Sequence, residues 1–132
     1  MRLSNEDHMQ ISDLAEQLGI TTRTIRLYEK FGLVEPPKRT EGRVRYYEKE
    51  DVKRFKFVLR LKTLGLTLEE MKELAELYNR EQKTPDKIMP RLIELLDTHL
   101  NSIKTKVATL QRLEKDIFDY RKRIVDQYNL SK

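Results

Sequence analysis

Three basic side chains, on Arg23, Arg26 and Lys30, recur at spacings of three and four residues. In an α-helix this spacing places them on one face, because a turn holds about 3.6 residues. Their cationic groups donate charge-assisted hydrogen bonds to phosphate oxygens, and arginine also pairs with the acceptor edge of guanine. The pattern therefore indicates a face that binds a polyanion, with Arg23 and Arg26 as candidates for contacts to base edges or phosphates.

The residues around this face predict a short helix. Thr21 or Thr22 can supply the side-chain oxygen that caps its first N–H groups. Gly32 closes it, since glycine adopts the left-handed conformation common at helix C-termini. Ile25 belongs to another face of the same helix and is predicted to be buried.

A second short helix is predicted just before this one. Its apolar stripe consists of Ile11, Leu14 and Leu18, and Gly19 ends it, while Ser12 can cap its start. Two short helices joined by a glycine-containing turn, the second with a basic face, have the form of a helix-turn-helix. The alternative on these residues is an ordinary helical hairpin with a solvated charged side.

A β-ribbon is predicted next, over residues 38–47, with a turn at Glu41-Gly42. Strand alternation places Arg43, Arg45 and Tyr47 on one side of it and Val44 and Tyr46 on the other. Arginines and a tyrosine hydroxyl on one side suit contacts with phosphates. The alternative is an exposed hairpin whose arginines are only solvated.

The composition supports a nucleic-acid partner. The chain of 132 residues carries a formal charge of +5, and residues 21–62 hold thirteen Lys and Arg against six Asp and Glu. This basic excess is confined to one region, as expected of a nucleic-acid footprint. The absence of cysteine excludes disulfides and thiolate metal sites. Without an apolar run of about 20 residues or a signal segment, we expect a cytoplasmic protein.

Three further helices follow the ribbon. One is predicted over residues 50–64, and another begins at the capping box formed by Thr67 and Glu70. The third is long, starts near residues 86–89 and ends at 124. Its apolar residues step by three and four, with one stutter at Leu110–Leu113. A seam of this length requires a partner helix, and self-association is the simplest solution.

These motifs together resemble the MerR family of transcription regulators, specifically a short, cysteine-free branch. The resemblance covers about residues 9–78 and is carried by residues 9–15, 22–33, 45–47, 51–52 and 64–71. It implies an all-α fold with a small β wing, in which a winged helix-turn-helix is followed by a dimerisation helix that pairs as an antiparallel coiled coil. The expected parts are a tail over 1–8, the DNA-binding domain over 9–79, a linker over 80–88, the dimerisation helix over 89–124 and a tail over 125–132.

The residues and the resemblance give one set of expected DNA contacts. These are Thr22, Arg23, Thr24, Arg26, Tyr28, Lys30, Lys38, Arg43, Arg45, Tyr47 and Lys62. The expected dimer contacts are Leu96, Leu100, Ile103, Val107, Leu110, Leu113 and Ile117. Two departures from the family pattern stand out: Leu27 replaces a frequent tyrosine, and Arg43-Val44 replaces Gly-Tyr in the wing, which shifts a contact onto Arg43.

The resemblance implies a homodimer on a pseudo-palindromic promoter that distorts the DNA so that RNA polymerase can engage both promoter elements. The effector is expected to be a non-metal metabolite such as an acyl-CoA, with Tyr78, Met89 and Tyr120 as weak candidates for its site; no cofactor or metal is expected. A regulator without a small-molecule effector, or a coiled-coil adaptor with a vestigial DNA-binding head, is the alternative. No constellation of nucleophile and base suggests an enzyme.

Overall fold

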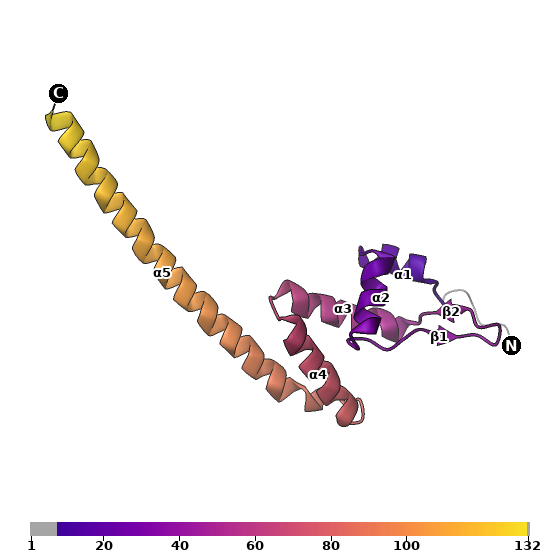
Figure 1. The fold of residues 1–132 in the computed structure, drawn as a ribbon. Helices are drawn as coiled ribbons and strands as arrows, with labels where there is room; N and C mark the ends of the chain where they lie inside the picture. The colour runs from indigo at the N-terminus through magenta and orange to yellow at the C-terminus, as the bar shows by residue number, and fades with distance from the viewer. Residues whose placement is uncertain (1–7, 132) are drawn as a thin grey trace. The chain divides into compact units, whose positions relative to one another are not determined.

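The computed structural model describes residues 8–131, and Figure 1 shows its ribbon. Of the predicted tail over 1–8, only His8 lies within the described residues. Helices account for most of the chain. In order, the elements are α1 (Ile11–Leu18), α2 (Thr22–Lys30), β1 (Lys38–Arg39), β2 (Arg45–Tyr46), α3 (Lys49–Thr63), α4 (Leu68–Arg80), the 3-10 turn η1 (Pro85–Lys87) and α5 (Met89–Leu130). The chain divides into two compact units, and the boundary between them lies between Ile93 and Glu94 in the sequence.

Helix α1 begins one residue before the predicted cap. Gln10 is its N-cap, and the backbone N–H of Gln10 donates to Asp13 Oδ2 at 3.2 Å. This reciprocal capping box satisfies the first N–H groups, so Ser12 lies inside the first turn and does not cap the helix. Gly19 ends α1 with a φ of 69°, as predicted.

Helix α2 has the predicted cap and the predicted buried residue. The N–H of Thr24 donates to Thr21 Oγ1 at 3.1 Å, and Ile25 is fully buried. Gly32 follows the helix with a φ of 74°, a left-handed conformation that glycine adopts without steric cost. Local capping chemistry and one buried side chain therefore fix where the basic face begins, ends and points.

The wing is a two-stranded antiparallel sheet in which Arg39 pairs with Arg45 and Lys38 with Tyr46. Its turn is closed by the Arg43 N–H, which donates to the Thr40 carbonyl at 2.8 Å. The left-handed residue of this turn is Arg43, with a φ of 61°, rather than Gly42. The predicted alternation is wrong at Tyr47, which is buried and pairs through its backbone with Met9 instead of continuing the exposed side of the ribbon.

The core of the first unit lies between the helix-turn-helix and the α3–α4 pair. Its fully buried side chains are Leu14, Ile25, Leu33, Tyr47 and Phe55. The capping box at Thr67 forms as predicted, with the Glu70 N–H donating to Thr67 Oγ1 at 3.1 Å. Met71, Leu74 and Ala75 bury the inner face of α4. This core sets the position of α2 and the wing relative to each other.

Helix α5 starts at Met89, with Pro90 in its first turn, and continues to Leu130. It therefore runs six residues past the predicted end at 124, into the predicted tail. The later apolar residues of its seam are exposed in the single chain; these are Leu100, Ile103, Val107, Leu110, Leu113 and Ile117. Leu96 is half-buried. Within residues 8–131, no helix combines the length and apolar character required to span a bilayer.

Candidate nucleic-acid interface

Helix α2 presents its basic face to solvent. Arg23, Arg26 and Lys30 are all exposed, and none of them forms an ion pair with another residue between 8 and 131. Thr22 and Thr24 are half-buried, and the Thr24 hydroxyl lies 2.9 Å from the Thr21 hydroxyl within the cap. The predicted cations are therefore available to a polyanion, whereas the Thr24 hydroxyl already has a partner.

The wing adds a cation that sequence reasoning missed. Arg43 and Arg45 are exposed, as predicted, and Arg39 is exposed as well. Arg39 lies directly opposite Arg45 in the antiparallel register, so both side chains project from the same face of the ribbon. Like charges in this position repel each other, and a bridging phosphate would relieve that repulsion. Pairing the strands across the predicted turn would have identified Arg39.

Tyr47 is buried within the first unit. Its hydroxyl donates to Glu29 Oε1 at 2.6 Å, and the residue as a whole is only 1% exposed. Burial, together with the hydrogen bond to Glu29, raises the pKa of Tyr47 well above the ordinary tyrosine value. The side chain joins the end of the wing to α2, and the predicted phosphate contact through this hydroxyl, which would have to displace Glu29, stays a prediction.

Tyr28 is also buried, on the face of α2 that packs against α3. Its ring stacks near Phe55 with centroids 6.3 Å apart, and Lys62 Nζ lies 6.0 Å from the ring centroid. Its buried hydroxyl has no hydrogen-bond partner in the part of the chain that the structure describes. Lys62 itself is exposed. Tyr28 thus supports the position of Lys62, and a direct DNA contact by Tyr28 stays a prediction.

Lys38 is engaged by carboxylates. Its Nζ lies 3.6 Å from Glu48 Oε2 and 3.8 Å from Asp51 Oδ2. These two acids flank the start of α3, where Asp51 also accepts the Glu48 N–H at 2.7 Å. Lys38 therefore links the wing to α3, and a phosphate would have to compete with both carboxylates for it.

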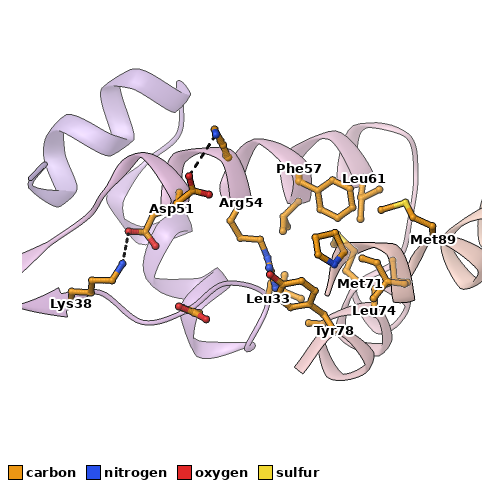
Figure 2. Close-up of a pocket in the computed structure, with 17 residues that line it drawn as sticks. Leu33, Lys38, Asp51, Arg54, Phe57, Leu61, Met71, Leu74, Tyr78 and Met89 are labelled. Carbon is orange, nitrogen blue, oxygen red and sulfur yellow. Dashed lines mark ion pairs between the residues drawn. The ribbon is translucent and has the colours of Figure 1, made fainter. Parts of the chain in front are cut away.

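A separate cavity of about 420 Å³ lies between α3, α4, η1 and the first turn of α5 (Figure 2). It contains two of the three predicted effector residues, Tyr78 and Met89, whereas Tyr120 lies on the exposed part of α5 and does not line it. The Arg54 guanidinium carbon lies 4.1 Å from the centroid of the Tyr78 ring. Sequence reasoning did not single out Arg54, because its contact is with a residue of the next helix.

Metal ligands do not gather in the described chain. Among residues 8–131, no three His, Cys, Asp or Glu side chains lie close enough together to hold an ion. The two histidines are His8, which stacks on Tyr46 at a centroid distance of 3.9 Å, and His99 on α5.

Comparisons with known proteins show which family has this arrangement. Residues 9–77 match the MerR HTH family regulatory protein model, and residues 52–119 match the model for MerR DNA binding. A ZntR homolog from Haemophilus influenzae is 35% identical over 117 residues, which cover 89% of this chain and 84% of that protein.

Two solved structures share the fold. The lead(II) complex of PbrR691 from Ralstonia metallidurans is 30% identical, with a TM-score of 0.66 and 86% of each chain covered. HiNmlR bound to promoter DNA, described as lacking the sensor domain, is 25% identical, with a TM-score of 0.60 and the same coverage of both chains. With an exposed basic helix, a charged wing and these matches over most of its length, the chain belongs to the MerR family of DNA-binding transcriptional regulators.

Proposed function

We propose that the protein acts as a homodimer that binds a pseudo-palindromic promoter in the cytoplasm. The observation that carries the proposal is the combination of the exposed basic face of α2 with the exposed apolar seam of α5. A single chain leaves Leu100, Leu110 and Ile117 in water, and pairing of two α5 helices would remove that surface from solvent. Two copies of α2 would then read two half-sites related by two-fold symmetry.

The proposed mode of action is distortion of the promoter so that RNA polymerase can engage both promoter elements. Exposed cations lie on the wing and on α3, and they can hold the DNA backbone beside the recognition helix. They are Arg39, Arg43 and Arg45 on the wing and Lys62 on α3. Backbone contacts spread in this way supply the energy needed to bend or untwist DNA.

The proposed effector is a non-metal metabolite, with an acyl-CoA as the first candidate. PbrR691 was solved with lead(II), but this chain contains no cysteine to supply the thiolates that soft metals prefer. The cavity that includes Tyr78 and Met89 supports a small organic molecule, because its size falls within the range of roughly 300–1,000 Å³ typical of such sites.

Footprinting on the gene's own upstream region tests the DNA-binding proposal. We expect two protected half-sites with enhanced cleavage between them, and a further change at the centre when an effector is added. Protection without central distortion would reject the proposed mode of action. No binding at low salt by the dimer would favour the coiled-coil adaptor with a vestigial DNA-binding head.

Thermal shift tests the effector proposal. A ligand that binds only the folded dimer raises its melting temperature. A panel of acyl-CoAs, amino acids and aromatic drugs that raises no melting temperature would favour a regulator without a small-molecule effector.

A further inference from the structure

We propose that the cavity between α3, α4 and η1 binds a medium-chain monocarboxylate, with its carboxylate on Arg54 and its apolar chain between α3 and α4. The inference rests on the proposed function in one respect, that the protein responds to a non-metal effector. It replaces the acyl-CoA by the free acid as the ligand of this cavity. The supporting observations are the charge pairing at the rim, the apolar interior and the segments that the cavity joins.

The rim of the cavity carries three cations and three carboxylates, and two of the cations, both lysines, form ion pairs with rim carboxylates. Lys38 pairs with Asp51, and Lys53 lies 3.5 Å from Glu50 Oε1. The third carboxylate, Glu35, pairs with Lys83, which holds the pKa of Glu35 below its usual range. Each rim carboxylate thus already has a lysine.

Arg54 is the remaining rim cation, and within residues 8–131 it forms no ion pair. Its guanidinium stacks on the Tyr78 ring (Figure 2), which restrains the plane of the group, and its charge contributes after those of Lys83 and Lys38 to the lowered pKa of Glu35. A guanidinium held in this way matches a carboxylate through two parallel hydrogen bonds. Arg54 is therefore the rim cation best placed to bind a monoanion, because the neighbouring carboxylate Glu35 already forms an ion pair with Lys83.

The same charge balance argues against a polyanionic ligand at this rim. The phosphates of a coenzyme A group would approach Glu35, Glu50 and Asp51 as well as Arg54, and the lysines are already paired. Because these carboxylates and lysines already form ion pairs, additional negative charges would gain little net attraction from them. A single carboxylate requires only Arg54.

The interior of the cavity is apolar. Phe57, Leu61, Met71, Leu74 and Met89 line it, and they come from α3, α4 and the start of α5. Two of these are methionines, whose flexible thioether side chains adapt to unbranched chains. An aliphatic or aryl-aliphatic tail would bury its surface here, which is the main source of affinity for such a ligand.

The position of the cavity connects it to the DNA-binding parts of the first unit. Leu33 lies in the segment that follows α2, Lys38 lies in the wing, and Ile88 precedes α5, and all three line the cavity. A ligand that contacts all three segments stabilises one arrangement of them. If DNA binding requires a different arrangement, ligand and DNA affinities change reciprocally.

Isothermal titration of the full-length dimer with four probes tests the proposal: octanoate, 1-octanol, octylamine and octanoyl-CoA. We expect octanoate to bind at least about tenfold more tightly than octanol or octylamine, a difference of about 1.4 kcal/mol. In Arg54→Gln this preference should disappear, whereas octanol should bind as before. Lys56→Gln is the matched control, because it removes the same charge from an exposed position of α3 outside the cavity.

Circular dichroism melting first establishes that both variants are folded. Equal binding of octanoate and octanol, or an octanoate affinity unchanged by Arg54→Gln, would overturn the proposal. So would octanoyl-CoA binding more tightly than octanoate and insensitive to Arg54→Gln, a result that leaves the proposed acyl-CoA response intact. The footprinting experiment is independent, since it needs no ligand to reveal DNA binding.

Discussion

Tyr47 connects the wing to α2, two parts of the candidate interface that lie apart in the sequence. Its hydroxyl donates to Glu29 on α2, and its backbone pairs with Met9, with N···O distances of 2.7 and 2.8 Å. Tyr47 therefore holds together the base of the wing, the recognition helix α2 and the segment around Met9. The hydroxyl is occupied in this role, so a phosphate could use it only by displacing Glu29.

We predict that Tyr47→Phe weakens the fold and leaves the electrostatics of DNA binding unchanged. Loss of one buried hydrogen bond costs about 1 kcal/mol of unfolding free energy, which lowers the melting temperature by roughly 2–6 °C. The slope of log affinity against log salt should stay the same, because no phosphate contact is removed. Tyr46→Phe is the matched control, and a slope reduced by about one in Tyr47→Phe alone would restore the phosphate contact.

The raised pKa of Tyr47 gives the same residue a signature at high pH. Its contribution to stability is fully present below pH of about 10, the ordinary tyrosine pKa, and is lost as pH rises through the higher folded value. The difference in melting temperature between wild type and Tyr47→Phe should therefore shrink above pH of about 10. A difference that grows in that range would contradict this assignment.

Arg43 combines a strained backbone with an exposed charge, and substitution separates the two. A left-handed φ of 61° costs a non-glycine residue on the order of 1 kcal/mol, and glycine recovers this while adding flexibility to the unfolded chain. We predict that Arg43→Gly leaves stability within about 1 kcal/mol of wild type and lowers DNA affinity, with a salt slope reduced by about one.

Arg43→Ala is the comparison, since it removes the charge and retains the strain. Its DNA affinity should match that of Arg43→Gly, and its melting temperature should be lower. Unequal DNA affinities for the two variants would show that the backbone of this turn, rather than the guanidinium, determines the contact.

At the residue scale, sequence reasoning succeeded where one helix decides the outcome. The spacing of Arg23, Arg26 and Lys30 and the burial of Ile25 follow from helical geometry alone. It failed at Tyr47 and Arg54, whose surroundings come from distant segments. Tyr47 bonds to a residue 18 positions away, and Arg54 stacks on a tyrosine of the next helix. Local periodicity contains no information about such pairs.

At the element scale, an ion pair links α4 to the first turns of α5. Arg91 in the first turns of α5 pairs with Glu73 of α4, and its Nη2 lies 3.1 Å from Glu73 Oε1. The hydrogen bond from Arg91 lowers the pKa of Glu73 below its usual range. This pair therefore connects the first turn of α5 to α4 within the first unit.

We predict a pH-dependent contribution from this pair. Because the folded pKa of Glu73 is lowered, its stabilisation is present above the ordinary value of about 4.3 and is lost as pH falls through the folded value. Glu73→Gln should lower the melting temperature at pH 7. The corresponding loss of unfolding free energy should be less than about 1 kcal/mol, because both side chains are partly exposed. The difference should shrink as pH falls below about 4.3 and through the lowered folded pKa of Glu73; a constant difference as the pH falls would rule the ion pair out as its cause.

Element boundaries were predicted well where a cap is encoded locally and less well where it is not. The Thr21 cap and Gly32 set the two ends of α2, and the capping box at Thr67 sets the start of α4, as predicted. The end of α5 was placed at 124 because the regular apolar seam stops at Ile124. The helix continues to Leu130 because no glycine or proline follows to end it.

At the scale of the whole molecule, each of the two units exposes a different kind of surface. The first unit concentrates exposed cations on α2 and the wing, and α5 exposes an apolar seam along its length. In the proposed dimer, the second α5 covers the apolar seam. The two basic α2 faces can then bind one DNA molecule together, and such bivalent binding increases the affinity.

This leads to a prediction about the seam. Leu110 and Ile103 lie on it, whereas Thr105 lies on the opposite side of α5, so charges placed at these positions act differently. We predict that Ile103→Glu with Leu110→Glu yields monomers in sedimentation equilibrium and weakens binding to a full operator by at least about a hundredfold, with binding to a single half-site unchanged. Thr105→Glu should remain dimeric and bind the full operator as wild type does. If the double variant were monomeric and still bound the full operator normally, each head would act alone, and the symmetric reading of DNA would have to be abandoned while the basic face of α2 kept its role.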